Sequence, residues 1–200
     1  MNTKEKIMDV ALHMFSERGY EAVSIRDICG EVGIKESTLY YHFKNKKDIL
    51  DSLIEKFRNH IGGLLSHIDE IPGEGQQKKG KNNIASSKIV DTYMMDSYLF
   101  DPFCNLMMRL MMIEQFHNEE IRVLYEKTLF TDPYEIYLNV FRRLSLQGAF
   151  PADQAENIVR QYHAYMTMLT FKYLLNGELT EARKKAYAKE VHTLMSGFGS

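Results

Sequence analysis

The segment from Ser24 to Lys47, SIRDICGEVGIKESTLYYHFKNKK, restricts the fold more than any other part of this chain. Ser24 has the hydroxyl of a helix N-cap. Apolar residues follow it at helical spacing, namely Ile25, Ile28, Cys29 and Val32. Gly33 can then adopt the left-handed conformation that ends a helix and reverses the chain. The segment therefore predicts two short helices joined by a tight turn.

The second helix, expected over about 36–43, is too short to be stable alone and must pack through Leu39 and Phe43. The side chains on its other faces are hydroxyls, an imidazole and ammonium groups, which suit phosphates and base edges. Asn45 is a plausible N-cap for the next helix, so Lys46 lies where backbone N–H groups favour an anion. This chemistry predicts DNA binding.

Ten residues of this region are assigned to the DNA contact: Ser24, Lys35, Glu36, Ser37, Thr38, Tyr40, Tyr41, His42, Lys44 and Lys46. The candidates for base edges are Lys35, Thr38 and Tyr41, and the candidates for phosphates are Ser24, Tyr40, His42, Lys44 and Lys46. A half-buried position is the alternative for Tyr40.

The sequence TLYYHFKNKKDIL, preceded by SIRDICGEVGIKES and by a helix ending in FSERGYEAV, resembles the N-terminal DNA-binding domain of the TetR family of repressors. The likeness covers about 4–57, and the spacing from Phe15 through Gly19, Gly33 and Phe43 to Lys46 is matched throughout. The resemblance implies a homodimer whose last two long helices, here within about 152–198, form the interface. Members often have Gly where this chain has Glu36, so an acidic side chain either alters the approach to DNA there or accepts from a cytosine N4 amino group.

The charge balance of the chain is near neutral, with a formal net charge of -2 over 200 residues. A modest positive patch beside the proposed reading helix comes from Arg26, Lys35, Lys44, Lys46 and Lys47. Such a patch is too weak to hold DNA by electrostatics alone, so two copies in a dimer are expected to bind two half-sites about one DNA turn, or a small multiple of it, apart.

Apolar residues at helical period recur along the chain and predict an all-α fold. We expect helices near 4–18, 46–68, 84–97, 102–117, 118–129, 133–147, 152–176 and 180–197, with Asp101-Pro102 and Asp132-Pro133 as helix starts. The polar run 69–83 is expected to be loop. The predicted organisation is a helix-turn-helix DNA-binding domain over 1–47, a linker helix over 48–68, and a helical ligand-binding and dimerisation domain over 69–200.

Methionine and aromatic residues between the linker helix and the C-terminal helices are typical of pliable binding sites and equally of an ordinary core. The predicted ligand-binding residues are Tyr98, Phe103, Met107, Met111, Tyr125, Tyr137 and Phe141. Arg109, Glu114 and His163 stand in the same apolar pattern, where each could orient a ligand or face solvent.

The histidines and cysteines have no metal-ligand spacing, and no nucleophile motif is present, so we expect no metal, no cofactor and no enzyme activity. Cys29 and Cys104 lie in apolar helical patterns and predict buried thiols, with redox sensing as the alternative. No run approaches the ~20 apolar residues of a membrane span, and a cytoplasmic protein is expected.

The function predicted from these features is a transcriptional regulator, expected to be a repressor, that a small and largely apolar ligand releases from a palindromic operator. The alternative is a DNA-binding module whose C-terminal domain is a protein-interaction scaffold without a small-molecule effector. The sequence does not specify the effector, the operator, the target genes, or repression against activation.

Overall fold

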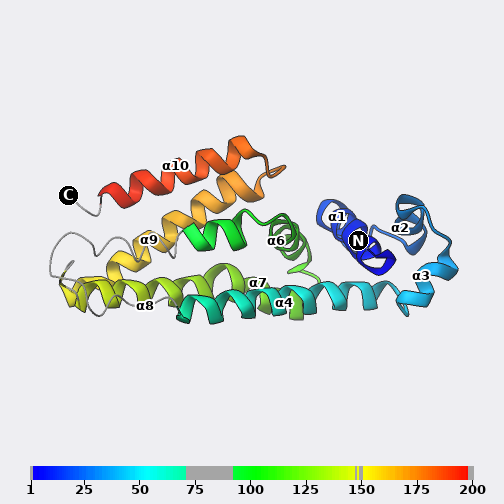
Figure 1. Ribbon diagram of the computed structural model, residues 1–200, viewed down its shortest axis with the longest axis horizontal. Coiled ribbons are helices and arrows are strands. Elements are labelled where there is room, and N and C mark those ends of the chain that lie inside the picture. Colours follow the sequence, from blue (N-terminus) through cyan, green and yellow to red (C-terminus); the bar gives the residue numbers. More distant parts are fainter. Residues whose placement is uncertain (1, 71–91, 147, 149–150, 198–200) are drawn as a thin grey trace. The chain divides into compact units, whose positions relative to one another are not determined.

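The computed structural model describes residues 2–70, 92–146, 148 and 151–197. All regular elements in this part of the chain are helical, which confirms the predicted all-α class (Figure 1). The chain divides into two compact units, one formed by residues 1–65 and 106–123 and the other by residues 66–105 and 124–200. The domain boundaries expected from the sequence stay a prediction.

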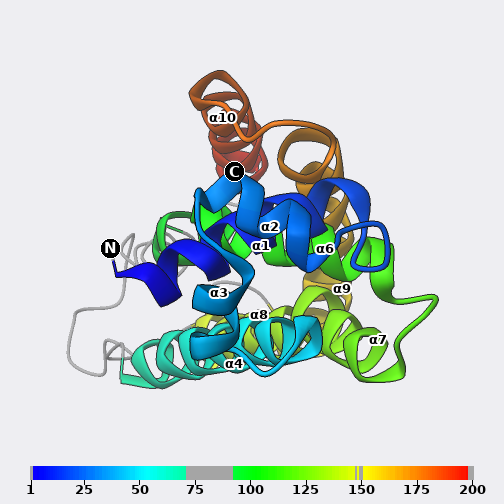
Figure 2. The same ribbon diagram turned by 90° about the vertical axis from the view of Figure 1, so that its right-hand side faces the viewer.

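The first unit contains α1 (Thr3–Arg18), α2 (Ile25–Val32), α3 (Glu36–His42) and most of α4 (Lys46–Glu70). Figure 2 shows α1, α2 and α3 gathered as one small group. Helix α1 packs on both α2 and α3. The centre of this group and of the adjoining part of α4 consists of side chains that are 0–2% exposed, namely Ile7, Phe15, Ile28, Leu39, Phe43, Ile49 and Phe57. Burial of this apolar set is what stabilises helices of seven and eight residues.

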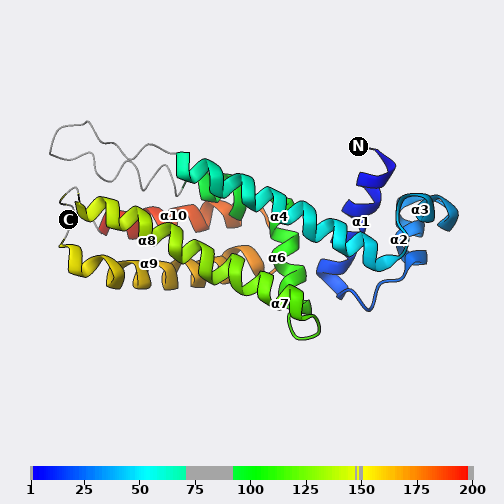
Figure 3. The ribbon, with the colours of Figure 1, turned by 90° about the horizontal axis from the view of Figure 1, so that it is seen from below.

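The second unit is built around η1 (Met95–Leu99), the first turn of α6 (Pro102–Glu114), η2 (Lys127–Thr131) and α8 (Asp132–Leu146). It continues through η3 (Ala152–Gln154), α9 (Ala155–Leu169), η4 (Thr170–Leu175) and α10 (Glu181–Gly197). Helix α8 lies beside α9 (Figure 3), and α10 packs on η4. Helix α7 (Glu119–Glu126) runs directly into η2.

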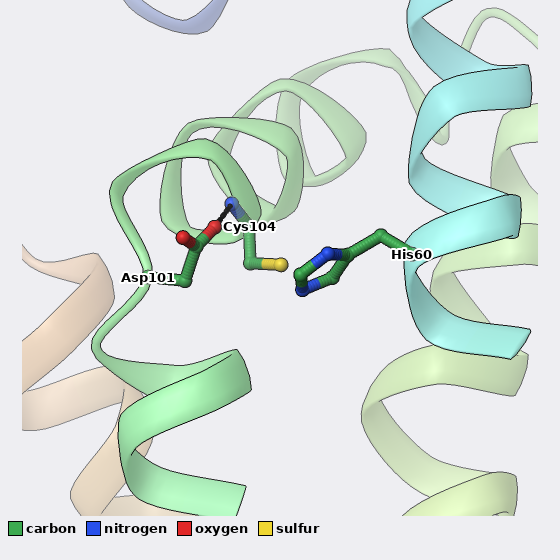
Figure 4. A group of neighbouring side chains, drawn as sticks. All are labelled: His60, Asp101 and Cys104. Atoms are coloured by element: carbon green, nitrogen blue, oxygen red, sulfur yellow. Dashed lines mark hydrogen bonds between the residues drawn. The ribbon is translucent and has the colours of Figure 1, made fainter. Parts of the chain in front are cut away.

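The start of α6 follows the sequence prediction. Asp101 precedes Pro102, and its Oδ1 accepts a hydrogen bond of 2.8 Å from the backbone N–H of Cys104 (Figure 4). The Cys104 thiol is buried, and burial raises its pKa above the ordinary value. Cys29 is buried as well, so the prediction of two buried thiols is confirmed.

Helix α8 begins at Asp132, close to the predicted start at Asp132-Pro133, but the predicted role of Asp132 as a cap at the end of a loop is wrong. The chain is continuously helical from α7 through η2 to α8, and Asp132 itself has helical dihedral angles of φ -62 and ψ -46. The five-residue π-helical segment η2 ends directly before this pair. Pro133 has no backbone N–H and cannot donate a helical hydrogen bond. The π-helical segment before it changes the hydrogen-bond pattern locally, so the chain remains helical across this position.

Other predicted boundaries differ by one to a few residues, as at α9, which begins at Ala155 after a 3-10 turn. The predicted loop over 69–83 is wrong at 69–70, because α4 continues to Glu70. The rest of that loop and the start of the predicted helix, over 84–91, lie outside the described residues. Within the part of the chain that the structure describes, no helix is long and apolar enough to cross a membrane.

Candidate nucleic-acid interface

Helix α2 is fixed at its start by a reciprocal pair of hydrogen bonds. The Ser24 hydroxyl accepts from the backbone N–H of Asp27 at 3.1 Å, and the Asp27 carboxylate accepts from the Ser24 N–H at 2.8 Å. The Ser24 hydroxyl also donates to Asp27 Oδ2 at 2.7 Å, and this bond, followed by the one from the Ser24 N–H, holds the pKa of Asp27 below its ordinary value because both favour the charged carboxylate. Ser24 is therefore an N-cap, and its hydroxyl already has a partner within the helix.

The turn between α2 and α3 depends on Gly33, which has φ 78 and ψ 37 in the left-handed region. Its N–H and that of Ile34 both donate to the Cys29 carbonyl, at 2.9 and 3.0 Å. Such a closure uses the free carbonyls at the end of α2 and sends the chain directly into α3. The predicted helix, turn and helix are confirmed.

Helix α3 is anchored by one face only. Leu39 and Phe43 are 0% and 2% exposed, whereas Tyr40 and Tyr41 are 52% and 85% exposed. The Tyr41 ring meets the His42 ring edge to face, with centroids 5.1 Å apart. The exposed face therefore presents a phenol whose orientation is supported by its neighbour.

The remaining predicted contact residues surround this face. Lys35, Ser37 and Lys44 are exposed, and Thr38 and His42 are half-buried. Lys35 is the N-cap of α3, and its side chain makes no capping hydrogen bond. Together they form a polar surface of cations and hydroxyls around Tyr41.

Glu36, the residue that departs from the family pattern, lies near Arg26. The Arg26 Nε and a Glu36 carboxylate oxygen are 3.5 Å apart, and both side chains are largely exposed. An exposed pair at this distance stabilises little. Its effect is to place a counter-charge beside the carboxylate at the edge of the candidate interface.

Lys46 has partners inside the protein. Its Nζ donates a hydrogen bond of 2.8 Å to the Tyr20 carbonyl and lies 4.1 Å from the centroid of the Tyr20 ring. The phosphate contact predicted for Lys46 stays a prediction, and the ammonium group has an internal role as well. Sequence reasoning missed Tyr20, because the contact uses a backbone carbonyl that any residue possesses.

The predicted effector residues are buried, apart from the half-buried Phe103. Tyr98, within the second unit, donates through its hydroxyl to the Thr128 carbonyl at 3.1 Å. The Tyr137 and Phe141 rings pack on Tyr162, with centroids 4.8 and 5.4 Å away. A packed core and a closed ligand site both require such burial, so the ligand role stays a prediction.

The three charged or titratable residues of that apolar pattern have separate surroundings. His163 is half-buried, its ring lies 5.8 Å from that of Tyr134, and burial lowers its pKa below the ordinary value. Arg109 is half-buried. Glu114 belongs to the first unit and is treated below.

The capped α2, the left-handed turn and the exposed α3 define a helix-turn-helix protein. Residues 7–53 match the model of the family described as bacterial regulatory proteins, tetR family. The N-terminal helices of this chain are therefore similar to the tetR family of bacterial regulatory proteins, the family that the sequence pattern resembles.

A similar curated protein is the biofilm operon icaADBC negative transcriptional regulator IcaR of Staphylococcus epidermidis, 41% identical over 68 residues. That match covers 34% of this chain and 37% of the relative, so the chain spans about a third of the length of the relative.

Two solved structures are similar over almost the whole chain. The ketosteroid transcriptional regulator KstR2 of Mycobacterium tuberculosis gives a TM-score of 0.64 at 18% identity, covering 98% of this chain and 94% of its own. A putative transcriptional regulator from Saccharomonospora viridis, in complex with choline, gives 0.62 at 21% identity, covering 96% and 95%. At these identities the likeness establishes the fold of both units and nothing of their ligands.

Proposed function

We propose that this protein is a homodimeric transcriptional repressor that binds a palindromic operator through α3 and is released by a small, largely apolar effector. The observation that carries the proposal is the division of α3 into a buried face, Leu39 and Phe43, and a face on which Tyr41 is 85% exposed. A helix held in this way can enter a major groove without losing its packing.

Sequence readout in the proposal comes from Lys35, Thr38 and Tyr41, and register on the duplex comes from the phosphate contacts. Of those, Lys44 is the clearest, because its side chain is exposed while its backbone N–H donates to Asp48 Oδ2 at 2.8 Å. That bond fixes the main chain at the point where α3 leads into α4. The ammonium group remains available for a phosphate oxygen.

Repression is supported by the name of the relative IcaR, a negative transcriptional regulator. The effector is supported by the choline-bound neighbour, whose ligand is small, and by the soft apolar side chains of this chain. Release would follow if the effector binds more tightly to a conformation that fits the operator poorly. A cytoplasmic location belongs to the same proposal, because the chromosome is the target.

The test is binding of the purified full-length protein to duplex DNA from the region upstream of its own gene, with Tyr41→Ala beside the wild type. Phe116→Ala is the matched control, since Phe116 is 82% exposed and lies outside α3. We expect specific binding by the wild type and the control, and a reduced preference for upstream over unrelated DNA in Tyr41→Ala. Equal binding of upstream and unrelated DNA by all three proteins would refute the proposal.

A further inference from the structure

Glu114 is a charged residue with an unusual position for its type. It is the last residue of α6 and is only 6% exposed. Its Oε1 accepts a hydrogen bond of 2.8 Å from the backbone N–H of Tyr20, in the turn after α1. Both residues belong to the first unit. Burying a carboxylate costs free energy unless it is hydrogen-bonded. The bond from the Tyr20 N–H therefore offsets the cost of burying Glu114.

The second link starts at the same residue. The Tyr20 carbonyl accepts from Lys46 Nζ at 2.8 Å, and Lys46 is the first residue of α4. An anion therefore holds the N–H of Tyr20 while a cation holds its carbonyl. Hydrogen bonds to charged groups are about twice as strong as neutral ones, so both links are stronger than ordinary turn contacts.

The approach of α6 to this turn is close. Gly19 has φ +80, and a Cβ atom there would lie 3.2 Å from Glu114 Oε1 and 3.3 Å from Ile113 Cγ2. Glycine thus permits both the backbone conformation and the short distance. Farther along α4, Arg58 Nη2 lies 3.1 Å from Glu120 Oε1, which adds an exposed contact between α4 and the same 106–123 segment.

We propose that Glu114 is a positioning residue for the DNA-binding helices. It holds the Tyr20 main chain, and the Tyr20 carbonyl holds Lys46. Lys46 in turn sets the first turn of α4, which only three residues separate from the end of α3. The structural step concerns the first unit alone. Only its consequence for operator affinity rests on the proposed function.

The structural step is tested by amide hydrogen exchange on the full chain. In Glu114→Ala we expect the Tyr20 amide and the first turn of α4 to exchange on the order of tenfold faster. Glu114→Gln keeps an oxygen that can accept from the Tyr20 N–H, and we expect exchange close to wild type. Glu119→Gln is the control, since Glu119 is 73% exposed and pairs with Arg122 in its own helix.

Operator affinity is measured on the same variants with upstream DNA. We expect Glu114→Ala to bind about tenfold more weakly and Glu114→Gln and Glu119→Gln to bind like wild type. If Glu114→Ala does not fold, Lys46→Met breaks the second link and is expected to leave Tyr20 protected while the first turn of α4 exchanges faster.

The outcomes separate the two proposals. Unchanged exchange at the first turn of α4 in Glu114→Ala, or in Lys46→Met where the first variant does not fold, overturns the positioning role. Altered exchange with wild-type operator affinity overturns its consequence for DNA binding. Altered exchange in a protein whose wild type binds no DNA refutes the proposed function and leaves the positioning role standing.

Discussion

At the scale of single residues, two side chains near the end of α3 present different chemistry to a ligand. Tyr41 offers a flat ring and a hydroxyl, whereas Lys44 offers a mobile positive charge, and both are exposed. Base edges differ between sequences and phosphates do not. Exchange of each side chain for alanine should therefore change different properties of the same complex.

We predict that Lys44→Ala weakens binding to operator and unrelated DNA by the same factor and lowers the salt slope of log affinity by about 1. Tyr41→Ala should instead reduce the preference for operator over unrelated DNA while the salt slope stays unchanged. Fluorescence anisotropy titrations at several salt concentrations measure both. A sequence-dependent effect of Lys44→Ala would contradict the assignment.

The Ser24–Asp27 capping pair predicts a pH effect. Asp27 has a lowered pKa in the folded protein, so its contribution to stability is present above its unfolded pKa and is lost as the pH falls through the folded value. Ser24→Ala removes the hydroxyl bond, so the pKa of Asp27 should rise toward the ordinary value. NMR titration of the Asp27 carboxyl measures this change. An unaltered pKa would assign the shift to the backbone bond alone.

At the scale of elements, residues with one strong local preference were predictable. Ser24 caps α2, Gly33 ends it, and Leu39 anchors α3. These features could be predicted because capping, a left-handed backbone and apolar spacing each depend on residues that are close together in the sequence. The bonds from Tyr20 to Lys46 and Glu114 were not predictable. They join backbone groups to side chains 26 and 94 positions away, and no local pattern encodes them.

Two glycines of the helix-turn-helix give a direct stability test. A Cβ atom meets nothing within 4 Å at either Gly30 or Gly33, but only Gly33 has a positive φ. We predict that Gly33→Ala lowers the free energy of unfolding by about 1 kcal/mol through left-handed strain. Gly30→Ala, inside α2, should raise it by up to about 1 kcal/mol. Urea unfolding followed by circular dichroism compares them, and equal effects of the two changes would contradict the strain argument.

At the scale of the whole molecule, the proposed dimer depends on which residues of α9 and α10 remain accessible to a second copy of the chain. Val159, Tyr162, Met166 and Leu169 of α9 are already buried within a single chain. What α9 leaves accessible is a face with Gln161, Ala164 and Met168, the last 45% exposed. Burial within one subunit depends on tertiary packing, which the helical period alone does not reveal.

We predict that Met168→Glu shifts the protein from twice the 23.3 kDa chain mass toward the single-chain mass in sedimentation equilibrium. A charge in an apolar interface is not compensated, so association weakens. Val123→Glu is the control, because Val123 is 51% exposed and lies outside 152–198. A monomeric wild type, or an unaffected Met168→Glu dimer, would count against this interface.

The central claim is that two copies of α3 read a symmetric DNA sequence. The most direct measurement is selection of bound duplexes from a random library by the purified full-length protein, followed by sequencing. The account predicts enrichment of an inverted repeat whose half-site centres lie one helical turn, about 34 to 36 Å, or a small multiple of it apart. It also predicts that Tyr41→Ala changes the preferred bases in both half-sites alike. A library that remains unenriched, or an enriched sequence without twofold symmetry, would contradict it.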